Sequence, residues 1–168
     1  MDSEDRNSVI AVPNFSVHDI RPEIDRHDVA HAGGGLQLSA HVPIDVGLAD
    51  EVHRDLVVRI LESVGSSFEI SVSRTKVVQK PDFDLLCLEV QDDSRRLPMI
   101  RKLFAGYPHE QENTDESFHV PLAALKRGHG KKYAGKSAFV QNLAETRPRI
   151  DRLLFSPKDD NLRAMVRL

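Results

Sequence analysis

The stretch SFHVPLAAL at residues 117–125 repeats a pattern that the chain has already used in SAHVPIDVG at residues 39–47. Each copy reads Ser, apolar, His, Val, Pro, aliphatic, and 78 residues separate His41 from His119. Apolar and polar residues alternate along residues 36–41, which predicts a strand whose polar face carries His41. Residues 118–125 likewise predict a strand. The two histidines are therefore expected at matching positions of a duplicated unit.

The flanking segments predict the rest of each unit. A helix is expected over residues 49–64 because apolar residues recur at helical spacing, and a shorter one within 92–107, capped by Asp93 or Ser94. The remaining expected elements are a short strand at 9–12, a short helix within 21–32, a hairpin of 68–78 and 83–90, and closing strands at 149–156 and 162–168. Two such halves predict an α+β fold with two pseudo-twofold lobes around a central cleft.

Composition sets limits on the class of protein. The 168 residues fit one domain, expected over 36–168 after a partly irregular segment at 1–35. A formal net charge of −3 gives no overall basic field for nucleic acid or a membrane. The start of the chain lacks a secretory pattern, no apolar run is long enough to span a bilayer, and the one cysteine, Cys87, lies in an apolar run. We therefore expect a cytoplasmic protein with a buried Cys87 and no membrane partner.

The paired His-Val-Pro strands resemble the 2H phosphoesterase superfamily, which includes 2',5'-RNA ligase-like proteins and cyclic nucleotide phosphodiesterases. That superfamily carries two copies of His-x-Thr/Ser-aliphatic on strands of duplicated lobes. FDLLCLEV at 83–90, the loop GKKYAGK and the ending LLFSPKDDN look most similar to 2H domains encoded by bacteriophages. The resemblance covers roughly residues 36–168 and is strongest in the second half.

The resemblance implies a metal-independent phosphodiesterase without a cofactor, in which His41 and His119 face each other across the cleft. One histidine takes a proton from a 2'-hydroxyl or water, and the other protonates the leaving oxygen. The implied ligand is a 2',3'-cyclic phosphate, a 2',5' linkage or a cyclic oligonucleotide. A phage enzyme of this kind would cleave immune second messengers in the host cytoplasm.

The chain departs from the superfamily at the third motif position, where Pro43 and Pro121 replace the hydroxyl residue that holds the phosphate. Proline has neither a hydroxyl nor a backbone N–H. A hydrogen bond to a charged group contributes about 1.5–3 kcal/mol, so two lost donors predict weakened catalysis. Two other functions stay open: a non-catalytic nucleotide- or RNA-binding module, and a phage structural or accessory protein.

The loop after the second motif, residues 126–136, is rich in Lys and Gly. Lys131 and Lys132 are expected near phosphates and Tyr133 is expected to stack on a base, if the loop folds over the cleft. A solvated charged surface is the alternative. The loop lacks the spacing and Ser/Thr of a P-loop.

His27 and His31 have the spacing of a zinc pair, but no third ligand is evident, so no metal site is expected. The aspartates of the turns are expected to cap turns and helices rather than form a catalytic pair.

Overall fold

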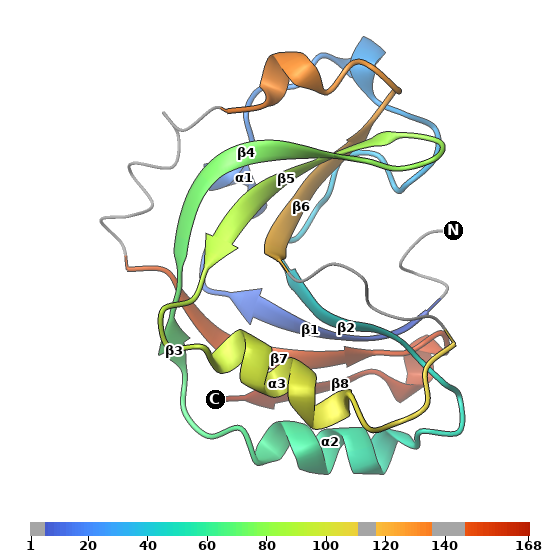
Figure 1. Cartoon of the computed structure of the whole chain (residues 1–168), viewed down its shortest axis with the longest axis vertical. Coiled ribbons are helices and arrows are strands. Elements are labelled where there is room, and N and C mark those ends of the chain that lie inside the picture. Colours follow the sequence, from blue (N-terminus) through green and yellow to red (C-terminus); the bar gives the residue numbers. More distant parts are fainter. Residues whose placement is uncertain (1–5, 111–116, 136–146) are drawn as a thin grey trace.

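The computed structural model describes residues 6–110, 117–135 and 147–168, which form two antiparallel sheets (Figure 1). The larger sheet, sheet A, has the order β2-β1-β7-β3, with β8 paired to β7. Its strands are β1 (Asn7–Pro13), β2 (Val42–Leu48), β3 (Phe68–Glu69), β7 (Arg149–Ser156) and β8 (Ala164–Arg167). The smaller sheet, sheet B, has the order β4 (Ser71–Gln79), β5 (Asp84–Gln91) and β6 (Phe118–Leu125).

Fully buried core residues mark one face of each sheet. In sheet A, Val9 and Ala11 of β1 are fully buried, whereas Ile10 between them is partly exposed. In sheet B, Leu88 and its partner Val120 are fully buried. Since side chains alternate along a strand, His119, which follows Phe118 and precedes Val120, lies on the opposite face of sheet B. We call the face of sheet B that carries His119, together with the face of sheet A that carries Ile10, the histidine face.

Two helices pack beside sheet A in the lower half of Figure 1. α2 (Arg54–Glu62) contacts β7 and β8, and α3 (Arg96–Phe104) contacts β2. The predicted caps of α3 were wrong, because the cap residue is Arg95, which makes no side-chain cap bond. The Asp92 carboxylate instead accepts the backbone N–H of Leu97 at 2.7 Å. The short helices are α1 (Val17–Ile20), η2 (Arg26–Asp28), η3 (Lys131–Tyr133) and η4 (Asp160–Leu162).

The outer edge of β6 is covered by the segment that leads to β2. The backbone N–H of Ala124 donates to the Gly35 carbonyl at 2.9 Å, and the N–H of Gln37 donates to the Leu122 carbonyl at 3.0 Å. These bonds satisfy backbone groups that an edge strand would otherwise leave open. They also hold the chain against β6 just before it reaches His41.

The outer edge of β2 is covered in the same way by residues 108–110, which follow α3. The N–H of Ala49 donates to the Pro108 carbonyl at 2.9 Å, and the isolated bridge Leu48↔His109 is antiparallel. His109 also places Nε2 2.8 Å from the Asp45 carboxylate, which is nearly fully buried. Each motif strand is therefore covered by the segment approaching the other, which is the two-lobed, pseudo-twofold arrangement that the repeat predicts.

The element order from β2 to β8 confirms the sequence prediction, and β1 and β6 form where they were expected. Other expectations differ from the structure in detail. The strand predicted from residue 36 begins at Val42, because residues 36 and 37 pair with β6, and Leu38 is 84% exposed. The short helix expected within residues 21–32 is the single 3-10 turn η2, and Val29 after it forms an isolated bridge to Leu125. The predicted strand 68–78 is divided, with β3 in sheet A and β4 in sheet B.

Candidate active site

The two motif strands meet at their edges. β2 and β6 are edge strands of different sheets and contact each other. Arg101 of α3 spans the junction: its Nε donates to the Ile44 carbonyl at 2.7 Å, and its guanidinium lies 4.2 Å from the centre of the Phe118 ring. Phe118 precedes His119, and Ile44 lies three residues after His41. One side chain therefore ties the surroundings of both histidines together.

His41 lies immediately before β2 and is half-buried. Its Nδ1 is 3.1 Å from the Ser39 carbonyl, which can only accept, so Nδ1 carries the hydrogen and Nε2 keeps its lone pair. Burial lowers the pKa of His41 below the ordinary 6.5, and the Ser39 carbonyl acts in the opposite direction. A neutral imidazole with an available Nε2 is suited to act as a general base.

His119 is paired directly with Glu89 of β5. Residues that pair across antiparallel strands share a face, with Cβ atoms about 4.5–5.5 Å apart. Glu89 is held from β4, where Ser73 and Arg74 both lie opposite it at a break in the register. The Ser73 hydroxyl donates to its carboxylate at 3.2 Å, and Arg74 lies 3.6 Å away.

Pro43 and Pro121 stand at two equivalent β-bulges. In sheet A, Pro43 pairs with Ile10 and Asp45 pairs with Val9, so Ile44 is an extra residue. In sheet B, Pro121 pairs with Cys87 and Ala123 pairs with Leu86, so Leu122 is an extra residue. Edge strands and bulges are the places where sheets tolerate proline. Bulges also bend a strand and re-aim its side chains, and they are frequent beside active sites.

The structure does not bring Lys131, Lys132 and Tyr133 to the motif histidines. Asp28, which is only 4% exposed, anchors the loop that carries these residues. Its carboxylate accepts a hydrogen bond from the Tyr133 hydroxyl at 2.6 Å and pairs with the Lys132 ammonium at 2.6 Å. His129 adds a third contact at 2.8 Å. Lys132, Tyr133 and His129, in that order, hold the pKa of Asp28 well below its usual range.

Tyr133 is correspondingly unsuited to stack on a base. Its side chain is 8% exposed, and burial followed by the Asp28 bond raises the pKa of its hydroxyl. The Thr75 hydroxyl donates to the Tyr133 carbonyl at 2.6 Å, and Thr75 is paired with Leu88 on the buried face of sheet B. The loop therefore packs against the face opposite His119. Lys131 is exposed, and Lys136 lies outside the described residues.

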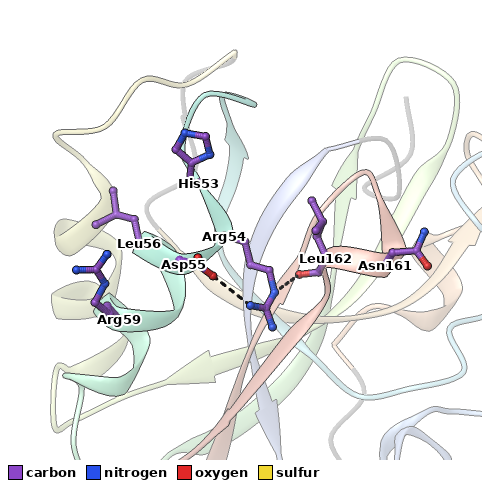
Figure 2. Close-up of a pocket in the computed structure, with 7 residues that line it drawn as sticks. All are labelled: His53, Arg54, Asp55, Leu56, Arg59, Asn161 and Leu162. Carbon is purple, nitrogen blue, oxygen red and sulfur yellow. Dashed lines mark hydrogen bonds and ion pairs between the residues drawn. The ribbon is translucent and has the colours of Figure 1, made fainter.

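A surface hollow of about 780 Å³ lies between α2 and η4 (Figure 2). It is lined by His53, Arg54, Asp55, Leu56, Arg59, Asn161 and Leu162. Arg54 already pairs with Asp55 at 3.4 Å and donates to the Leu162 carbonyl at 3.0 Å. The hollow adjoins α2, which follows the end of β2 that is remote from His41. A strand rises about 3.3 Å per residue, so the seven steps from His41 to Leu48 span about 23 Å. The hollow is therefore separate from the two motif histidines, His41 and His119.

His27 and His31, which have the spacing of a zinc pair, do not share a helix face. His27 lies in η2, and His31 lies beyond its end. Among residues 6–110, 117–135 and 147–168, no group of three or more His, Cys, Asp or Glu side chains is placed to hold a metal ion. Cys87 is a buried cysteine outside any disulfide, as predicted. No helix in the described part of the chain is long and apolar enough to cross a membrane.

Comparison with solved structures supports the fold. The structure of Kluyveromyces marxianus Usb1 aligns with a TM-score of 0.63 and 12% sequence identity, covering 99% of both chains. The structure of the same protein with uridine monophosphate aligns with a TM-score of 0.60, again at 12% identity and 99% coverage of both. The chain thus has a two-lobed, 2H phosphoesterase-like fold. No protein-family model matches the sequence, and no curated protein matches it.

Sequence reasoning missed the polar residues beside the second motif. Glu89 stands within the apolar middle of β5, and Lys76 of β4 donates from Nζ to the Ser117 hydroxyl at 3.1 Å. Glu89 interrupts the apolar run LLCLEV, which was the available signal. Its position opposite His119 depends on strand pairing, which the sequence does not state.

Proposed function

We propose that the chain is a phosphodiesterase that acts on RNA or oligonucleotide phosphodiesters through His41 and His119. The observation that carries the proposal is that the two motif strands contact each other, with His119 in β6 and His41 immediately before β2. The likeness to the Usb1 structures, one of which contains uridine monophosphate, supports a nucleotide ligand.

The proposed reaction uses the two imidazoles as an acid–base pair. His41 Nε2 takes the proton of a ribose 2'-hydroxyl, whose oxygen bonds to the adjacent phosphorus. The phosphorus–oxygen bond to the leaving group breaks, and His119 gives its proton to that oxygen, leaving a 2',3'-cyclic phosphate. Water replaces the 2'-hydroxyl when a cyclic phosphate is hydrolysed. Both proton transfers are supplied by protein groups, so the proposed chemistry is metal-independent.

The substrate class is to be settled by a panel: a short 3'-uridylated RNA, 2',3'-cyclic UMP, a 2',5'-linked dinucleotide and a cyclic oligonucleotide, each with and without a chelator. The last two also test the phage-type role suggested by the motif resemblance. Turnover that survives the chelator is expected on at least one substrate. Loss of turnover with chelator, restored by a divalent metal, would contradict the proposal.

The histidine variants give the sharpest test. General acid–base catalysis contributes about 10² to 10⁴ in rate, so His41→Ala and His119→Ala should each lower turnover by about 100-fold or more. His53→Ala is the matched control, because His53 is exposed and lines the separate hollow between α2 and η4. Equal activity in all three variants would exclude the pair as the catalytic groups.

Pro43 and Pro121 favour a second candidate, a nucleotide-binding module without turnover, since neither residue can donate to a phosphate. This alternative predicts uridine monophosphate binding by the wild-type protein and no activity on the whole panel.

A further inference from the structure

A phosphodiester is an anion, and charge that develops during its cleavage needs fixed donors. The two motif prolines offer none, and Lys131 and Lys132 belong to the loop on the other face of sheet B. The histidine face of sheet B nevertheless carries a cation close to the second motif. This cation is Lys76.

Strand pairing aligns Lys76 with Pro121, the second motif proline, across β5. Lys76 pairs with Cys87, and Cys87 pairs with Pro121. Paired residues share a face, and Pro121 shares its face with His119 two residues earlier, so Lys76 projects from the histidine face. Its neighbour Thr75 projects to the buried face, as its bond to Tyr133 shows.

The side chain of Lys76 is directed toward the start of β6. Its Nζ donates to the hydroxyl of Ser117 at 3.1 Å, and Ser117 lies two residues before His119. Along the strands, the pair Glu89 and His119 lies between the paired residues Lys76, Cys87 and Pro121 and the position of Ser117. To reach Ser117, the Lys76 side chain therefore extends past the pair that contains His119, and its ammonium lies beside the Ser117 hydroxyl.

The charges around Lys76 leave it suited to an anion. Glu89 is engaged by Ser73 and Arg74 of β4. In the described part of the chain, the contact made by the Lys76 ammonium is to the neutral Ser117 hydroxyl and not to a carboxylate. A lysine ammonium has three N–H donors, so its bond to one hydroxyl leaves two for a further acceptor.

We propose that Lys76 and Ser117 form a phosphate subsite, which holds the non-bridging oxygens of the phosphate presented to His119. The proposal deepens the proposed function, because it supplies the donors that the motif prolines lack. It can be tested without turnover, since it predicts binding of a nucleotide phosphate in the absence of any reaction.

The test compares uridine monophosphate with uridine by calorimetry or NMR titration. Lys76→Met should weaken uridine monophosphate binding by about tenfold or more and leave uridine binding unchanged, because only the phosphate is affected. Lys76→Arg should retain most of the affinity, and Ser117→Ala should lose less than Lys76→Met. The matched control is Lys80→Met, since Lys80 is an exposed lysine one residue beyond the end of the same strand. Thermal unfolding of each variant establishes that it is folded.

Wild-type affinity for uridine monophosphate in folded Lys76→Met would overturn the subsite, even if the wild-type protein turns over a substrate. The converse pattern, loss of binding in Lys76→Met together with no turnover on any substrate, would retain the subsite and reject the phosphodiesterase. A wild-type protein that binds neither uridine monophosphate nor inorganic phosphate would overturn the subsite.

Discussion

Pro43 and Pro121 occupy the same position in two β-bulges, each just before the extra residue of its strand. The bulges give these prolines a structural explanation, since an edge strand with a local break tolerates a residue without a backbone N–H. The equivalence shows that the two motifs share a bulge as well as a sequence pattern. Two residues before each proline lie the histidines, His119 within β6 and His41 immediately before β2.

The prolines lead to the first prediction. Replacing both with threonine restores a hydroxyl and a backbone N–H at each motif, and threonine suits a strand. We expect turnover on at least one substrate of the panel to rise by about tenfold, equivalent to about 1.4 kcal/mol of transition-state stabilisation. Initial rates of the purified double variant measure this.

The double valine variant is the control, because valine matches threonine in shape and restores the N–H without the hydroxyl. Threonine above valine attributes the gain to the hydroxyl. A folded threonine variant that is less active than wild type would show that the bulged prolines belong to a site of different geometry.

The second prediction concerns pH. Burial lowers the pKa of His41, so His41 is neutral at pH 7 and gains a proton only below 6.5. Activity should therefore fall on the acid side through a limb that lies below pH 6.5. NMR titration of the His41 ring provides the same value without a substrate, and a midpoint above 6.5 would contradict the assignment of His41 as the base.

The third prediction concerns Glu89, which lies opposite His119. Residues paired across antiparallel strands share a face, so the Glu89 carboxylate is part of the surroundings of His119. Glu89→Gln should lower turnover on the panel, and Glu89→Asp should retain part of it. Wild-type turnover in folded Glu89→Gln would exclude this role.

The fourth prediction concerns the loop anchored by Asp28. The pKa of this carboxyl is depressed, so its contribution to stability is present above its ordinary 3.8 and is lost as the pH falls through the folded-state value. Asp28→Asn should lower the thermal midpoint at pH 7, and the difference from wild type should shrink below pH 3.8.

Adjacent lysines provide a matched pair for the same loop. Both lysines are exposed, but the Asp28 carboxylate contacts Lys132, Tyr133 and His129, so Lys132→Ala removes an ion pair of Asp28 and Lys131→Ala does not. Differential scanning fluorimetry should show a lower midpoint for Lys132→Ala than for Lys131→Ala. Equal midpoints would show that the ion pair does not stabilise the loop.

The sequence predicted a helix or strand correctly where the spacing of apolar residues within the segment determines the type of element. The residues of β6 were predicted correctly because FHVPLAAL is bounded by polar segments on both sides. The repeat itself predicted the two-lobed fold. Leu38 was misplaced because alternation over 36–41 does not reveal that Leu36 bridges to Ala123 of the other sheet.

The site was predictable only in part for the same reason. His41 and His119 carry a motif, so they were identified as candidates. Tyr133 was expected to meet a base, but its hydroxyl is bound by Asp28, a residue 105 positions earlier in the chain. Lys76 and Glu89 owe their places beside His119 to strand register, which depends on contacts between distant segments.

A crystal structure with bound uridine monophosphate would show whether His41 and His119 contact one phosphate. We expect the phosphate between the two imidazoles, with a nitrogen of each ring at a hydrogen-bonding distance of about 2.6–3.2 Å and the Lys76 ammonium on a non-bridging oxygen. A nucleotide bound with its phosphate elsewhere, for example in the hollow between α2 and η4, or imidazoles too far apart to share it, would show that the two histidines are not the catalytic pair.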